Sequence, residues 1–179
     1  MKFKDTDLLD YKGVEFDVYK DSNGITFMKW QNGNWIDNIS DYAEVFLGKC
    51  KSCKGFYKDI FEGFEYDSVL VVGLGFGLIP NELYTNNKCS IIDILEISQE
   101  VIDYNAYSGH LSEDIKITKG DVFTYDTDDM YDLIIVDTVW KVEDINEDKY
   151  ETLVSRYYKN LNTGGALYVP VINKWIIKD

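Results

Sequence analysis

The sequence of 179 residues predicts an α/β fold: a doubly wound, mostly parallel sheet that follows a small N-terminal β-meander. Three observations support this prediction. Apolar and polar residues alternate over residues 14–20, and two Asn-Gly pairs separate this run from apolar runs at residues 25–30 and 35–36. Five short apolar runs then alternate with helical patterns, and a cluster of glycines follows the first run directly. We therefore divide the chain into residues 1–66, the meander with helices, and residues 67–179, the sheet.

The composition indicates which kinds of molecule the protein is suited to bind. Hydrophobic residues make up 45% and charged residues 28%, as in folded soluble domains. The 18 basic and 32 acidic residues give a net charge of −14, which disfavours nucleic acid and anionic membrane surfaces as partners. No apolar run approaches the roughly 20 residues that span a bilayer, and the first residues lack the apolar core of a signal peptide. We therefore expect a cytoplasmic protein with reduced cysteines.

The first part carries signals of antiparallel strands and then of helices. Val14, Phe16 and Val18 alternate with acidic residues, which is the period of a strand with one buried face. Two Asn-Gly pairs between strand-like runs favour type I′ turns and predict a three-stranded meander. Apolar residues at helical spacing then predict short helices over residues 41–47 and 56–61.

Five apolar runs predict the strands of the main sheet. They cover residues 68–72, 90–95, 115–118, 131–136 and 166–172. Ser98 is suited to cap a helix after the second run. An apolar stripe from Tyr150 to Leu161 predicts a helix that ends at Gly164. Strands that alternate with helices pair in parallel, and right-handed crossovers wind the chain over both faces.

A glycine-rich loop, G-x-G-x-G, follows the first of these strands. Gly73, Gly75 and Gly77 let the backbone turn sharply and approach a ligand without Cβ atoms in the way. The third glycine of a dinucleotide fingerprint would fall on Leu78, so the spacing favours a nucleoside ligand without pyrophosphate over NAD. A plain strand-to-helix turn is the alternative.

Three acids follow the next three strands, at the edge where open α/β sheets bind ligands. Glu96 lies about 20 residues beyond the loop, where a carboxylate accepts from both ribose hydroxyls; a solvated acid is the alternative. Asp121 is suited to accept from an exocyclic amino group such as that of adenine, and an Asx turn is the alternative. Asp137 is suited to orient a ligand or to take a proton from an amine; a cap for the next loop is the alternative.

Four motifs together resemble those of the class I S-adenosylmethionine-dependent methyltransferases. They are VLVVGLGFG (69–77), ILEIS (94–98), GDVF (120–123) and YDLIIVD (131–137). The resemblance implies a Rossmann-like fold and S-adenosylmethionine as cofactor. It also implies that the glycine loop passes the methionine part, that Glu96 holds the ribose and that Asp121 meets the adenine. The acidic surface and Asp137, the candidate catalytic residue, favour methyl transfer to a small amine-bearing or cationic acceptor.

Within this group, the layout is similar to spermidine synthase, whose proteins also begin with a β-meander and a helix. The run LEISQEVIDYN (95–105) and the Gly120-Asp121 pair carry that similarity. Two acidic positions of that family fall on Phe76 and Trp140 here. Aminopropyl transfer from decarboxylated S-adenosylmethionine is one alternative. A non-catalytic nucleoside-binding or assembly subunit is another.

The end of the chain gives two further expectations. Only residues 173–179 follow the fifth strand, so we expect a sheet truncated there. Since an exposed apolar edge invites pairing, strand 166–172 should be covered by the meander or by a second copy of the chain. No metal site is predicted, because Cys50 and Cys53 lack the second half of a zinc site and His110 is the single histidine.

Overall fold

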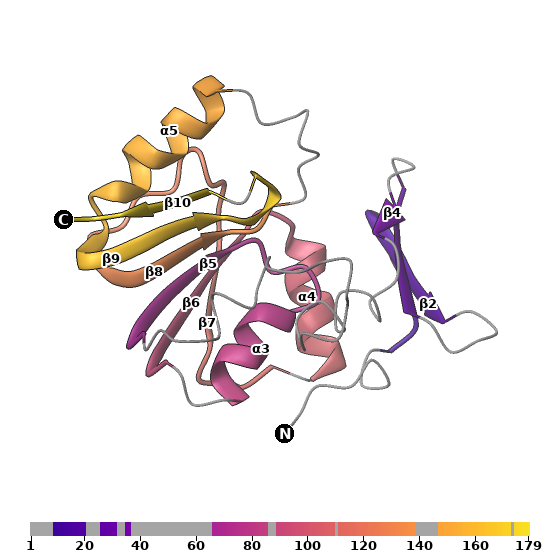
Figure 1. Ribbon diagram of the computed structural model, residues 1–179. Coiled ribbons are helices and arrows are strands. Elements are labelled where there is room, and N and C mark those ends of the chain that lie inside the picture. Colours follow the sequence, from indigo (N-terminus) through magenta and orange to yellow (C-terminus); the bar gives the residue numbers. More distant parts are fainter. Residues whose placement is uncertain are drawn as a thin grey trace, which may run out of the picture.

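Two sheets organise the chain (Figure 1). The computed structural model describes residues 9–20, 26–31, 35–36, 66–85, 89–109, 111–138, 147–172 and 174–179. The predicted helices near residues 41–47 and 56–61, and also Cys50, Cys53, His110 and Trp140, lie outside these ranges.

Six strands form the central sheet in the order β10-β9-β8-β5-β6-β7. Their bounds are β5 (Ser68–Val72), β6 (Ile91–Glu96), β7 (Lys116–Lys119), β8 (Tyr131–Val136), β9 (Leu161–Val169) and β10 (Lys174–Ile177). β5 pairs in parallel with both β6 and β8, so the strand order reverses beside it. β7 and β9 extend the two sides, also in parallel. The predicted doubly wound, mostly parallel sheet is confirmed, and its switch point lies between β5 and β8.

Helices cover both faces of this sheet, as Figure 1 shows. α3 (Leu78–Thr85) and α4 (Gln99–Ser108) pack on one face, where Leu83 and Tyr104 join the core. α5 (Glu147–Tyr158) packs on the other face through Leu153 and Tyr157. Because both faces are covered, β5 is buried along its whole length. None of the described helices is long and apolar enough to cross a lipid bilayer.

The ends of α4 follow the local sequence. The Ser98 side chain accepts the backbone N–H of Val101 at 3.1 Å, which confirms the predicted N-cap. Gly109 ends the helix with φ 65°, the left-handed conformation that glycine adopts without strain. The helix start is therefore fixed directly after the end of β6.

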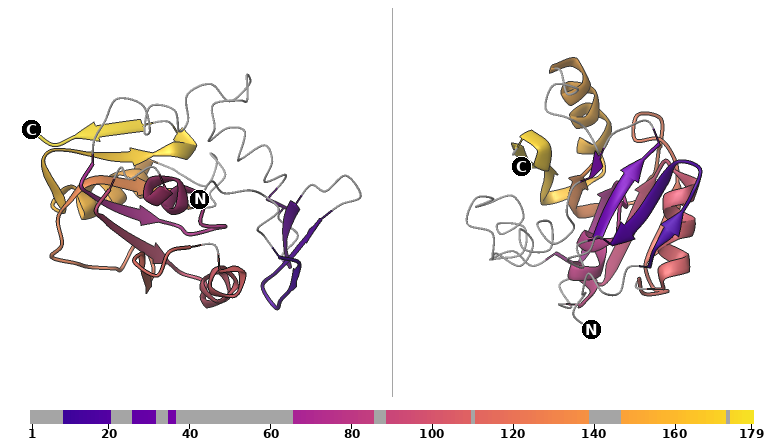
Figure 2. Two further views of the ribbon diagram at one scale, coloured as in Figure 1. Left: turned by 90° about the horizontal axis from the view of Figure 1, so that it is seen from below. Right: turned by 90° about the vertical axis from the view of Figure 1, so that its right-hand side faces the viewer.

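The N-terminal strands form a separate antiparallel sheet. β2 (Phe16–Lys20), β3 (Thr26–Trp30) and β4 (Trp35–Ile36) confirm the predicted meander, and β1 (Tyr11–Lys12) adds a short fourth strand. Figure 2 shows this sheet beside α4. Phe16 packs edge-on against Tyr104 of α4, with ring centroids 5.8 Å apart. The two parts thus share a core, and the boundary at residue 66 stays a prediction.

The sheet does not end with its fifth strand, which corrects the expected truncation. After a short 3-10 helix, η3 (Pro170–Ile172), β10 returns antiparallel to β9. Trp175 of β10 stacks on Tyr168 of β9, with ring centroids 4.1 Å apart. Seven residues are enough for one tight turn and a short return strand. The edge of β9 is therefore covered by the same chain, and not by the meander, and a second copy of the chain is not needed there.

The boundary between α5 and β9 also differs from the prediction. The helix ends at Tyr158, and Leu161, predicted on its apolar stripe, begins β9. Gly164 and Gly165 lie inside the strand, where the pairing with β8 shifts register. Leu161 is buried in the strand and would also be buried on the apolar side of a helix. Its spacing from Tyr157 therefore could not distinguish a helix from a strand.

Candidate cofactor site at the carboxyl edge of the sheet

The glycine loop joins β5 to α3 at the switch point. Gly73, Gly75 and Gly77 all have positive φ, at 98°, 49° and 70°. Side chains are strained in this region, so the loop conformation requires glycine. Gly73 also lies against β8, because a Cβ there would be 2.0 Å from the carbonyl oxygen of Asp137. Gly73 therefore serves the close packing of the two strand ends.

Gly75 differs from Gly73 in its surroundings. A Cβ at Gly75 would meet no atom of the described residues within 4 Å, so this part of the loop faces open space. The backbone N–H of Gly77 donates to the carbonyl of Leu74 at 2.8 Å and closes the turn. The loop thus combines a packed first glycine with an open middle.

Glu96 connects this loop to helix α4. Its side chain is only 8% exposed at the end of β6. Oε2 accepts the backbone N–H of Leu74, and Oε1 accepts that of Ser98, each at 2.8 Å. The alternative of a solvated acid is therefore wrong. A carboxylate offers about four acceptor sites, so two donors leave Glu96 capacity for two more.

Asp121 lies beside Glu96 in the neighbouring strand end. The backbone N–H of Gly120 donates to the carbonyl of Glu96 at 2.9 Å and brings the two strand ends together. Oδ1 of Asp121 accepts the N–H of Phe123 at 2.9 Å, so the Asx turn is present. Within the described ranges no hydrogen bond reaches Oδ2, and the turn leaves that oxygen available as an acceptor.

Asp137 lies on the other side of the loop, at the end of β8. Its backbone N–H donates to the carbonyl of Val72 at 2.8 Å, and its own carbonyl faces Gly73. Its side chain is half-buried. The next residue, Thr138, has a buried Oγ1 without a hydrogen-bond partner among the described residues. The four predicted strand ends thus converge on one edge of the sheet.

Two residues of α4 make contacts that were not predicted: Asn105 with the glycine loop, and Glu100 with the N-terminal sheet. Asn105 of α4 donates from Nδ2 to the carbonyl of Gly75 at 2.8 Å. Glu100 accepts the N–H groups of Val14 and Glu15 at 2.8 and 2.7 Å. A signal that could have marked Asn105 is a polar amide one position after Tyr104 and four after Val101, which are both core residues of α4. No local signal marked Glu100, because its partners are 85 and 86 positions away.

The N-terminal sheet docks through Glu100 at the start of α4. A Cβ at Gly13 would lie 1.6 Å from Glu100 Oε1, so any other residue here would require the Glu100 side chain to move. Ser98 Oγ donates to Glu15 Oε2 at 2.5 Å. These contacts bring the turn between β1 and β2 next to the residue that holds Glu96, and the N-terminal sheet thus borders the candidate site.

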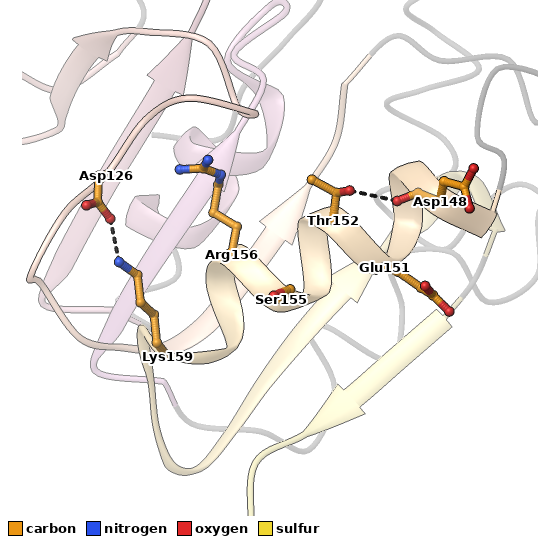
Figure 3. Close-up of a pocket in the computed structure, with 7 residues that line it drawn as sticks. All are labelled: Asp126, Asp148, Glu151, Thr152, Ser155, Arg156 and Lys159. Carbon is orange, nitrogen blue, oxygen red and sulfur yellow. Dashed lines mark hydrogen bonds and ion pairs between the residues drawn. The ribbon is translucent and has the colours of Figure 1, made fainter.

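A separate surface pocket of about 730 Å³ runs along α5 (Figure 3). Its lining residues are Asp126, Asp148, Glu151, Thr152, Ser155, Arg156 and Lys159. Lys159 pairs with Asp126, and Arg156 donates to the carbonyl of Tyr125 at 3.0 Å. None of the predicted site residues lines this pocket. Among the residues that the structure describes, no group of three side chains is arranged to hold a metal ion.

Comparison with known proteins identifies the fold. No protein-family model and no curated protein matches the chain. The N-methyltransferase NodS from Bradyrhizobium japonicum WM9, solved with S-adenosyl-L-homocysteine, matches with a TM-score of 0.51 and 18% identity over 64% of this chain and 57% of NodS. The DhpI–SAH complex matches with a TM-score of 0.54 and 18% identity over 73% of this chain and 61% of DhpI.

A third match is CalS10, a SAM-bound amino pentose methyltransferase from Micromonospora echinaspora. Its TM-score is 0.53 at 15% identity, over 76% of this chain and 57% of CalS10. The chain thus spans less than two thirds of each of these three methyltransferases. At this identity the likeness shows the fold alone: the chain has the Rossmann-like methyltransferase fold.

Proposed function

We propose that the chain binds S-adenosylmethionine at the carboxyl edge of its sheet and transfers the methyl group to a small amine-bearing or cationic acceptor. One observation carries the proposal: buried Glu96 is hydrogen-bonded to the glycine loop through Leu74 and still has acceptor capacity. The similar fold of NodS, DhpI and CalS10, which were solved with SAM or SAH, supports it.

The residues at this edge suit an adenosyl ligand. Open space at Gly75 admits the close approach of a ligand to the loop backbone. Glu96 offers its remaining acceptor sites to ribose hydroxyls, and Asp121 offers Oδ2 to an adenine amino group. Ile97 follows Glu96 directly and is 63% exposed, so it gives an apolar surface on which a purine ring would lose contact with water. These polar and apolar groups are of the kinds that would contact an adenosine.

When bound, S-adenosylmethionine supplies a methyl group on a sulfonium, which is already electrophilic. The contribution of the chain is therefore mainly to hold donor and acceptor in line. Glu96 and the glycine loop fix the nucleoside end. Asp137, on the far side of Gly73, orients an amine or accepts its proton. The net charge of −14 supports a cationic acceptor, because such a field raises the local concentration of cations.

Aminopropyl transfer is a second candidate because the meander precedes the sheet, as in the layout of spermidine synthase. Phe76, however, stands at one of the acidic positions of that family. It is 6% exposed and packs in the core, with its ring centroid 5.9 Å from that of Tyr104. A polyamine would find no carboxylate at this point of the loop, which favours methyl transfer.

Calorimetry with four ligands tests the proposal: S-adenosylmethionine, its decarboxylated form, S-adenosylhomocysteine and methylthioadenosine. S-adenosylmethionine should bind more tightly than its decarboxylated form, and Glu96→Ala should weaken binding by about 10- to 150-fold, the scale of hydrogen bonds to a charged group. Glu113→Ala, at an exposed position outside the site, is the matched control and should bind as the wild type does.

Three outcomes would contradict parts of the proposal. No binding of any of the four ligands would refute the site. Tighter binding of the decarboxylated form would favour aminopropyl transfer. Binding without formation of S-adenosylhomocysteine from any amine in a panel of small acceptors would indicate the non-catalytic nucleoside-binding subunit.

A further inference from the structure

We infer that Asn105 is a positioning residue that holds the glycine loop in its ligand-binding conformation. It would not touch the ligand and would act through the carbonyl of Gly75. The consequence for cofactor affinity rests on the proposed function. The consequence for the loop itself does not, because it concerns the chain without ligand.

The contact with Gly75 is the specific function of this side chain. Asn105 is 1% exposed, and Nδ2 donates to the carbonyls of Gly75 and Val101, each at 2.8 Å. Val101 lies one turn earlier in α4, where its carbonyl is already the expected acceptor for the backbone N–H of Asn105. Among the described residues, no other donor reaches the carbonyl of Gly75. The amide thus satisfies a loop carbonyl that the backbone leaves without a partner.

Fold stability alone does not explain an amide at this position. Oδ1 of Asn105 is buried and has no hydrogen-bond partner among the described residues. A buried acceptor without a donor opposes folding, whereas an apolar side chain of the same size would carry no such penalty. Its neighbours on α4, Val101 and Tyr104, are both apolar core residues. An apolar residue at position 105 would have no donor for the carbonyl of Gly75, and this hydrogen bond explains why an amide is present.

The hydrogen bond restricts the part of the loop that faces open space. The peptide group is planar, so fixing the Gly75 carbonyl also fixes the orientation of the Gly75–Phe76 peptide. Three glycines in five residues would otherwise leave this segment with wide backbone freedom. A loop that is ordered before binding loses less entropy on binding. Asn105 thus raises the affinity for the ligand without contacting it.

The test compares Asn105→Leu with the matched control Asn160→Leu. Asn160 is 4% exposed, and its Nδ2 also donates to two backbone carbonyls, those of Thr127 at 2.7 Å and Asp129 at 3.0 Å. Both substitutions keep side-chain volume and remove two hydrogen bonds. Only one of them removes a contact to the glycine loop.

Two measurements are made on each variant. Without ligand, amide hydrogen exchange of residues 73–77 should become faster in Asn105→Leu and stay at the wild-type rate in Asn160→Leu. With S-adenosylmethionine, affinity should fall about tenfold in Asn105→Leu and stay unchanged in Asn160→Leu. Equal loop exchange in Asn105→Leu and wild type would overturn the inference. Absence of binding in the wild type would overturn the proposed function instead, and the exchange result would still decide on Asn105.

A third measurement needs no variant. In the wild type, the side-chain amide protons of Asn105 should exchange slowly, because the side chain is 1% exposed and its Nδ2 donates to two carbonyls. Exchange at the rate of a solvent-exposed amide would contradict the inference even if Asn105→Leu failed to fold.

Discussion

The two edges of the central sheet use the same residue types for different purposes. At the amino edge, Asp132 accepts from four donors: the N–H groups of Asp67 and Ser68, Ser68 Oγ and Asn162 Nδ2, at 2.9, 3.0, 3.3 and 2.7 Å. At the carboxyl edge, Glu96 accepts from two. The first carboxylate has its acceptor capacity filled by the fold, and the second keeps part of it.

The glycines show the same difference. A Cβ at Gly165, at the amino edge, would lie 2.9 to 3.1 Å from three backbone carbonyls. A Cβ at Gly75, at the carboxyl edge, would meet nothing within 4 Å of the described chain. Gly165 is thus closed in by backbone packing, whereas Gly75 has free space beside it.

The largest effect on stability is expected for Gly165→Ala. The added methyl would press on three carbonyl oxygens, and overpacking of this kind costs about 2–3 kcal/mol. Urea denaturation should show that loss, while affinity for S-adenosylmethionine in the folded protein stays at the wild-type value. If Gly165→Ala lost affinity but kept its stability, Gly165 would not be the packing residue that we infer at the amino edge.

Asp132→Ala should come next, at about 2 kcal/mol, because it leaves several donors without an acceptor. The pKa of Asp132 sharpens this prediction. Burial alone would raise the pKa, but hydrogen bonds from Asn162, Ser68 and Asp67 outweigh it and lower the pKa below 3.8. The charged form thus stabilises the fold fully above the unfolded-state pKa, and this contribution is lost as the pH falls through the lower folded-state pKa.

The pH dependence of Asp132→Ala is therefore specific. Its deficit in unfolding free energy should be constant between about pH 5 and 7 and should shrink below about pH 4. Denaturation curves of both proteins at several pH values measure it. A deficit that grows on acidification would show that Asp132 does not act as a hydrogen-bonded carboxylate.

Gly75→Ala should have the smallest effect on stability, about 1 kcal/mol from the left-handed backbone alone. Its effect on ligand binding should be large, since the methyl group would enter the open space beside the loop. Calorimetry should show at least tenfold weaker binding of S-adenosylmethionine, about 1.4 kcal/mol. Wild-type affinity in this variant would mean that the ligand does not approach the loop at Gly75.

The parts of the molecule that depend on local sequence could be predicted. The glycine loop, the strand ends and the Ser98 cap follow from residues within a few positions of one another. β10 could not be predicted, because its strand is defined by pairing with β9 and by the stack of Trp175 on Tyr168. The contacts of Asn105 and Glu100 were missed for the same reason, since their partners lie 30 and more positions away.

Glu96 and Asp121 were predicted as strand-end residues and Asp132 was not singled out, and the sequence did not show how each acid is used. Glu96, Asp121 and Asp132 all occur near ends of apolar runs. Their hydrogen-bond partners come from other strands and loops, and only the fold brings these together. Which carboxylate keeps acceptor capacity is therefore a property of the tertiary structure.

The most direct test of the account compares two isosteric variants, Glu96→Gln and Asp132→Asn. Glu96→Gln turns one oxygen into an amide group that faces a backbone N–H donor, and Asp132→Asn places an amide group against the backbone donors at Oδ2 or the Asn162 amide at Oδ1, so both should lose stability. Only Glu96→Gln should also lose affinity for S-adenosylmethionine, by about tenfold or more, when calorimetry is done on folded protein. Equal affinities in the two variants would contradict the claim that the carboxyl edge of this sheet holds the nucleoside through Glu96.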